Sequence, residues 1–192
     1  MATNKRKKRG KKGLSAIPIR QLCYMSVFVA IIAVSAQILI PLPHGVPMTL
    51  QTFTITMSGI MLGPKKGTLT ALVYLLLGGI GIPVFAGFSG GLGIIFGFTG
   101  GFIMSFPIMA YMAGIGGGKN NRVWLACCLT LGTVFNLLVG MLWFGIITGN
   151  TLIHTFFIAV LPFLPGSVIE IVLITLVGFR MKGMMVTLIN SY

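Results

Sequence analysis

The sequence predicts an all-α integral membrane protein with six transmembrane helices and both termini in the cytoplasm. Three observations predict this fold class: an apolar composition, long uninterrupted apolar runs, and an alternation of basic and uncharged connections. Of the 192 residues, 56% are hydrophobic and 8% are charged, and the mean hydropathy is +1.01. Because a soluble domain carries roughly a quarter of charged residues, lipid must be the main solvent of this chain.

The apolar runs favour helices over a β-barrel, the other structure that satisfies all of its backbone hydrogen bonds in lipid. A barrel strand reads as a segment of roughly ten residues with alternating polarity. Residues 22–40 form a nearly continuous apolar run instead. At about 1.5 Å per residue, a helix of this length crosses the hydrocarbon core.

The connections between the apolar runs predict the topology. The chain has 14 basic residues and one acidic residue. The basic residues occupy four places: the N-terminal 20 residues, Lys65 and Lys66, Lys119 and Arg122, and Arg180 and Lys182. Uncharged connections alternate with them, at residues 41–48, 78–101 and 148–154. Positive charge stays in the cytoplasm, which predicts six spans near residues 22–40, 49–62, 68–82, 96–116, 123–147 and 155–179.

These boundaries divide the chain into three parts. Residues 1–20 form a basic cytoplasmic tail, residues 21–182 a membrane domain, and residues 183–192 a C-terminal tail. The run KRKKRGKK at residues 5–12 is also typical of a nucleic-acid-binding arm. In a membrane protein we interpret it as a segment that fixes topology and contacts anionic lipid, and we expect no nucleic-acid partner.

Short and interrupted spans predict where a ligand binds. The second and third spans are short, and Pro162 and Pro165 interrupt the sixth. Since proline is favoured in the first turn of a helix, the sixth helix should begin near Pro165, after a short helix within residues 151–161 near the outer surface. Irregular backbone at membrane depth persists only against protein or a water-filled cavity, so we expect a binding site here.

The segment IPVFAGFSGGLGIIFGFTGG at residues 82–101 is the most unusual part of the sequence. Together with residues 41–51, it is expected to form the substrate-binding loops, folded inward and lined by backbone N–H groups, Phe85 and Phe88. It matches neither a P-loop nor a dinucleotide-binding turn. With one acidic residue, and with His44 and His154 in separate connections, no catalytic set or metal-ligand cluster is present in the sequence. We therefore expect no enzyme activity, no ATPase and no metal.

Four motifs carry a resemblance to a known family. They are VPMTLQTF at 46–53, GIMLGPKKGTLTALVYLLLGGIGIPVFAGFSGGLG at 59–93, GFTGG at 97–101, and PFLPG at 162–166. These motifs closely resemble the BioY family, the biotin-specific substrate-binding (S) components of energy-coupling factor (ECF) transporters. The resemblance implies a six-helix bundle in the cell membrane that captures biotin from outside and delivers it inward. It also implies a transmembrane coupling (T) protein and two ABC ATPases as partners, with the vitamin as cargo and no other cofactor.

The resemblance and the loop chemistry together give the expected substrate-binding residues. They are Gln51, Phe85, Phe88, Ser89, Gly90, Gly91, Phe102, Asn136, Trp143, Ser167 and Glu170. The family usually carries an aspartate and a lysine at the positions of Ser167 and Glu170, and a proline at Phe98. The head group of the cargo is therefore read differently here, or the cargo is a biotin-like carboxylate such as lipoate or dethiobiotin.

Glu170, the one acidic residue, has two interpretations. It lies ten residues before Arg180, or about 15 Å of helix inside the cytoplasmic interface, and it shares a helix face with Ser167. An acid at this depth usually faces a cavity or a partner. It either lines the floor of the pocket with Ser167, or it is an uncharged structural acid bonded to a neighbour such as Asn136.

Ser26, Ala30 and Ala33 form a strip of small residues along one face of the first helix. The family resemblance implies that this face docks on the coupling protein, whereas ordinary packing within the bundle is the alternative. A third reading of the whole chain, from another functional class, is a pore or structural membrane protein. Its only support is the glycine-rich loop, because the spans hold too few ionisable residues for a charged ring.

Removing the basic run should disturb orientation without disturbing ligand binding. Deleting residues 2–12 should lower the yield of correctly inserted protein, because the positive charges that hold the N-terminus inside are lost. Biotin affinity, measured by calorimetry on the correctly inserted fraction, should equal that of the full chain. Weaker binding in that fraction would show that the tail contributes to the site.

Overall fold

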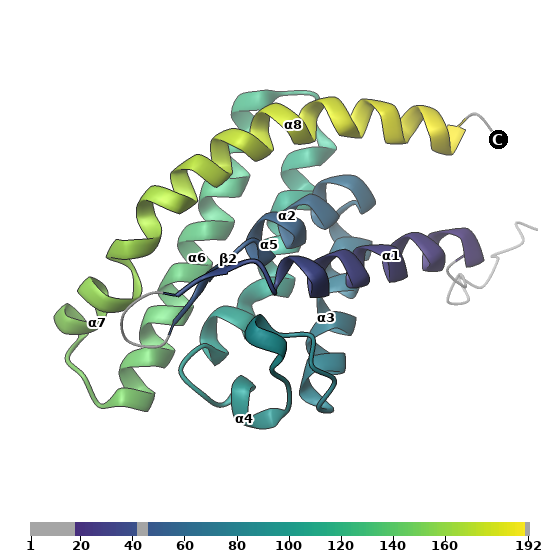
Figure 1. The fold of residues 1–192 in the computed structure, drawn as a ribbon. Helices are drawn as coiled ribbons and strands as arrows, with labels where there is room; N and C mark the ends of the chain where they lie inside the picture. The colour runs from purple at the N-terminus through teal and green to yellow at the C-terminus, as the bar shows by residue number, and fades with distance from the viewer. Residues whose placement is uncertain (1–17, 42–45, 191–192) are drawn as a thin grey trace, which may run out of the picture.

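The computed structural model describes residues 18–41 and 46–190 and is almost entirely helical (Figure 1). Residues 1–17 of the basic tail, residues 42–45 with His44, and residues 191–192 lie outside the described residues. The α-helices are α1 (Ile19–Ser35), α2 (Gln51–Leu62), α3 (Pro64–Gly79), α4 (Leu92–Ile95), α5 (Gly100–Gly118), α6 (Arg122–Thr148), α7 (Leu152–Ala159) and α8 (Leu164–Asn190). Two 3₁₀ turns (Ala86–Phe88, Leu161–Phe163) and an antiparallel pair, β1 (Leu39–Ile40) with β2 (Met48–Thr49), complete the fold.

Helix α5 is the centre of the bundle and packs on α2, α3 and α6. Small residues allow these helices to approach closely, as is common in lipid, where dispersion contacts replace the hydrophobic effect between helices. Gly59 of α2 lies directly against the backbone carbonyl of Ala110 in α5, and Gly114 lies against Pro64 at the start of α3. The main core, around Ile32, Tyr74 and Phe106, fills the space between α1, α3 and α5.

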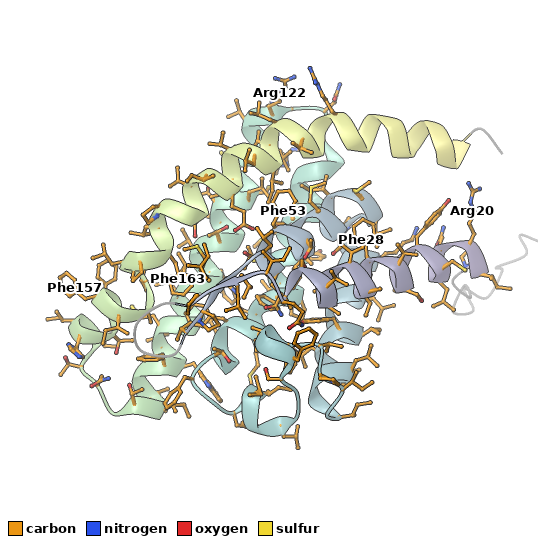
Figure 2. The ribbon with its side chains drawn as sticks, viewed as in Figure 1. Arg20, Phe28, Phe53, Arg122, Phe157 and Phe163 are labelled. Atoms are coloured by element: carbon orange, nitrogen blue, oxygen red, sulfur yellow. The ribbon has the colours of Figure 1, made fainter. Side chains whose placement is uncertain are left out.

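The basic connections lie at one end of this bundle. Lys65 and Lys66 are in the first turn of α3, and the contact of Gly114 with Pro64 brings that turn to the end of α5. Lys119 follows α5 and stacks over the ring of Trp124, 3.9 Å from its centroid. Figure 2 shows Arg122 at the upper edge and Phe157, near the uncharged connection, at the lower left. The alternation of charge along the sequence therefore corresponds to two different ends of the molecule.

Several helices begin or end at other residues than the sequence predicted. The first apolar run, expected to be helical through residue 40, ends as α1 at Ser35, because Leu39 and Ile40 pair with β2. An apolar run alone does not distinguish a helix from the short strand that follows it. The third helix begins at Pro64, four residues before the predicted start. The fourth span begins as α5 at Gly100, four residues after its predicted start, and α4 precedes it.

The interrupted last span was predicted closely. Helix α8 begins at Leu164, beside Pro165, and α7 is the short helix expected within residues 151–161. Helix α8 continues to Asn190, however, so residues 183–190 extend the helix rather than forming a separate tail. In Figure 1, α8 leaves the other helices toward its C-terminal end.

Three helical segments in the described part of the chain are long and apolar enough to cross a membrane. They are Gly100–Gly118, Arg122–Thr148 and Leu152–Gly178, the last of which joins α7, the 3₁₀ turn and α8. Helices α1, α2 and α3 have 17, 12 and 16 residues and are shorter than an ordinary span. The count of six spans stays a prediction.

The close contact between α2 and α5 should not tolerate a methyl group. A Cβ at Gly59 would overlap the carbonyl oxygen of Ala110, and backbone cannot rotate out of the way. We expect Gly59→Ala to lower the thermal unfolding midpoint of the purified protein by several degrees, as overpacking costs about 1–3 kcal/mol. Gly118→Ala is the matched control, since nothing lies within 4 Å of a Cβ there. Equal midpoints for the two variants would contradict this packing.

Candidate functional site

A cavity of about 730 Å³ lies at the end of the bundle opposite the basic connections. Its walls come from the starts of α2, α5 and α8, the later half of α6, the β1–β2 pair, and the loop between α3 and α5. Most of the lining is apolar, including Phe53, Phe102, Phe106 and Phe163. In Figure 2, Phe53 and Phe163 lie on the two sides of the space between α1, α2 and α8. The cavity thus forms where helices break or begin, as the short and interrupted spans predicted.

Glu170 lines this cavity with one of its oxygens unpartnered. Thr52 Oγ1, on α2, donates to Glu170 Oε2 over 2.9 Å. Glu170 Oε1 is buried and has no hydrogen-bond partner, which is true of no other buried side-chain nitrogen or oxygen among the described residues. No lysine, arginine or histidine is among the described residues that line the cavity. Within the described part of the chain, one oxygen of the carboxyl group thus receives no hydrogen bond.

Asn136 lines the same cavity but does not bond to Glu170, as one interpretation of the sequence expected. Its Nδ2 donates to the Phe102 carbonyl over 2.9 Å and to Ser105 Oγ over 2.6 Å. A carbonyl partner fixes which end of the amide carries the N–H groups. The Asn136 carbonyl oxygen is left without a partner in the described part of the chain, and, like Glu170 Oε1, it is a hydrogen-bond acceptor.

Gln51 is also at the cavity, where it belongs to a buried polar chain. Its Nε2 donates to the hydroxyl of Tyr74 on α3, which donates to the Val84 carbonyl over 2.8 Å. Thr49 Oγ1 donates to Gln51 Oε1 over 3.2 Å. This chain connects β2, α2, α3 and the loop that follows α3. Gln51 therefore holds the walls of the cavity in place as well as lining it.

Phe85 and Phe88, which the sequence placed together in the glycine-rich loop, lie in different surroundings. Phe85 is fully buried, lies against Gly78, and lines the cavity, with its ring edge-on to Tyr74 at 5.6 Å. Phe88 is 73% exposed and points away from the cavity, which corrects the prediction that both rings line it. The loop turns back at this point, and Phe88 adopts a positive φ of 55°.

The remaining predicted residues divide in the same way. Ser89 and Ser167 line the cavity, whereas Gly90 and Gly91 do not. Gly91 N–H donates to the Gly78 carbonyl over 2.6 Å and so closes the loop onto α3. The backbone of these two glycines therefore shapes the loop.

Two aromatic residues of α5 and α6 were also expected to line the site. Phe102 does so, and its ring stacks on Phe163 at 5.8 Å. Trp143 does not: its Nε1–H donates to the Gly97 carbonyl over 3.0 Å, and its ring packs near Phe96. The indole supports the outer loop from behind.

Sequence analysis missed Thr52, Phe163 and Tyr74. Thr52 and Phe163 lie within the quoted motifs VPMTLQTF and PFLPG, so the motifs signalled the region without resolving which side chain faces the ligand. Only the fold shows that Thr52 meets Glu170, since 118 positions separate them in the chain.

The strip of small residues on α1 is partly free. Ser26 and Ala30 are exposed, and Ala33 is half-buried against the main core. Met25, Val29 and Ile32 face the bundle instead. The first two residues of the strip are thus available to a partner, and the third is shared with the core.

Comparisons with known proteins identify the family of this chain. A profile of the BioY family matches residues 5–186. The chain belongs to the BioY family. It is 38% identical to a Pyrococcus horikoshii protein named as a probable biotin transporter BioY, over 85% of this chain and 97% of that protein. It is also 38% identical to the biotin transporter BioY of Thermotoga maritima, over 85% and 96% of the two chains.

The architecture agrees with a solved BioY-type structure. A crystal structure at 2.1 Å of the S-component for biotin from an ECF-type ABC transporter superimposes with a TM-score of 0.80. That alignment covers 86% of this chain and 92% of the other, at 27% identity. The S-component-like helical bundle is confirmed. Family membership and the three long apolar helices together make this a membrane protein.

Proposed function

We propose that this chain is the biotin-binding S component of an ECF-type importer, a multi-pass protein of the cell membrane. It captures the vitamin from outside and delivers it inward together with a coupling protein and two ABC ATPases. The observation that supports this most is a largely apolar cavity, in a BioY chain, whose lining includes the Glu170 carboxyl group and the Asn136 carbonyl oxygen as hydrogen-bond acceptors.

The chemistry of biotin suits this lining. Its fused rings are largely apolar, its cyclic urea presents two N–H donors, and its tail ends in a carboxylate. The cavity volume falls in the usual range for small-molecule sites. The urea N–H groups find acceptors in the Glu170 carboxyl group and the Asn136 carbonyl, two residues of the cavity lining.

Charge sets the orientation of the ligand. A carboxylate beside Glu170 would meet another acceptor, with no basic residue among the described residues of the lining to compensate, and like charges repel. The tail therefore points away from Glu170, and the urea ring points toward it. Lipoate, which has no N–H donor, leaves both acceptors unmet and is not favoured, in agreement with the names of the relatives.

Binding by purified protein tests this function. We expect biotin to bind in calorimetry, dethiobiotin to compete because it keeps the cyclic urea, and lipoate to compete at least 100-fold more weakly, since a site built for N–H donors rejects ligands without them by about that factor or more. Absence of biotin binding, with and without the coupling module, would remove the proposal. Liposome flux by the chain alone would favour a pore.

Substitution of Glu170 tests its role in that site. Glu170→Gln should bind nearly as well as the parent, because the amide still accepts a hydrogen bond. Glu170→Leu should lose about 1–3 kcal/mol of binding free energy, the cost of an unmet polar group. Val168→Leu is the control, on the exposed side of the same helix. If Glu170→Leu binds like the parent in folded protein, the carboxyl group has a structural role only.

The exposed strip of α1 should serve transport without serving binding. Ala30→Leu should lower biotin uptake in cells that contain the ATPase module, because a bulky side chain separates closely packed helices. Biotin affinity should not change. Val27→Leu, at an exposed position off the strip, is the control. Normal uptake by Ala30→Leu would place the docking face elsewhere.

A further inference from the structure

The Gln37 side chain bonds three backbone groups, two in the outer loop and one in α1, although it does not itself line the cavity. Its Oε1 accepts the N–H of Phe88 over 2.7 Å. Its Nε2 donates to the carbonyl of Phe85 over 3.1 Å and to that of Ala33, in α1, over 3.0 Å. Both carbonyl partners fix the orientation of the amide. One side chain thus uses its acceptor and both of its donors on backbone groups.

The segment that Gln37 contacts, residues 85–89, is a strained turn that few side chains support. Phe88 has a positive φ of 55°, and Gly87 before it a φ of 66°. A left-handed conformation is disfavoured for a phenylalanine and persists only where its surroundings fix it. Side-chain packing does not fix this conformation, because the Phe88 side chain is 73% exposed. Inside the turn, Phe85 N–H donates to the Ser89 carbonyl over 2.9 Å.

This turn is part of the cavity wall. Phe85, Ala86 and Ser89 line the cavity from the turn, and Ile38, directly after Gln37, lines it from β1's side. Gln37 therefore lies behind the wall, between the two segments that form this part of it. Displacement of the turn would open the wall at Ser89 and Ala86.

We propose that Gln37 is a positioning residue that fixes the turn at residues 85–89 against the cavity and ties it to α1. The inference rests on the proposed function in one respect, because it implies that the rate of biotin release depends on these hydrogen bonds. The role of Gln37 in holding the turn does not depend on the ligand. The bond to the Ala33 carbonyl means that the helix carrying the exposed strip and the wall of the cavity move as one unit.

Gln37→Met is the direct test, since methionine has a similar length and forms no comparable hydrogen bonds. Biotin should leave the variant about 5- to 50-fold faster, as two loop hydrogen bonds are lost. Hydrogen–deuterium exchange should rise in peptides covering residues 84–91 and stay unchanged in α5 and α6. Gln21→Met is the matched control, because Gln21 is on α1, the helix that ends just before Gln37, does not line the cavity, and has no side-chain hydrogen bond to any described residue.

Gln37→Glu is the second variant, and it keeps the acceptor for Phe88 N–H while removing both donated bonds. It should protect the Phe88 amide better than Gln37→Met and release biotin at an intermediate rate. If Gln37→Met matches Gln21→Met both in hydrogen–deuterium exchange of the loop and in the rate of biotin release, the proposal is overturned. Faster exchange spread equally over α5 and α6, which indicates general destabilisation, also overturns it. If the parent binds no biotin, the proposed function fails, and loop exchange alone still decides the role of Gln37.

Discussion

The need to satisfy backbone polar groups where helices break governs this structure. In lipid, an unmet N–H or carbonyl costs several kcal/mol, so irregular backbone must find partners inside the protein. Here side chains provide them. Gln37 bonds both sides of the outer turn, Tyr74 donates to the Val84 carbonyl, and Trp143 donates to the Gly97 carbonyl. These hydrogen bonds hold the non-helical segments that surround the cavity in place.

The same constraint explains why the cavity is apolar with a few acceptors. Most polar side chains near it turn toward backbone or toward each other, as Gln51 does with Tyr74 and Asn136 does with Phe102. What remains open to a ligand is the part of each group that the protein does not use. For Asn136 this part is the carbonyl oxygen, an acceptor that suits an N–H donor on a ligand.

Sequence reasoning predicted the helical class, the break near Pro165 and the place of the cavity, because each follows from composition, proline and charge along the chain. It could not place Phe88, since the direction of a side chain in a turn depends on a positive φ that the residues Phe-Ser-Gly do not predict. One of the two interpretations of Glu170 put Asn136 beside it, whereas Thr52 takes that position. Such pairings are set by the crossing of distant helices, and no local pattern encodes them.

Glu170 shows how such a site exchanges stability for binding. A hydrogen bond from Thr52 satisfies one oxygen, and the other stays buried and unmet in the free protein. A leucine at this position would cost the free bundle less, because an unsatisfied buried polar group is destabilising by about 1–3 kcal/mol. A ligand that brings an N–H donor removes that cost only in the bound state. Because it binds the folded protein alone, it also stabilises the fold. Under the proposed function, the carboxyl group is thus unfavourable for the empty protein and favourable for the loaded one.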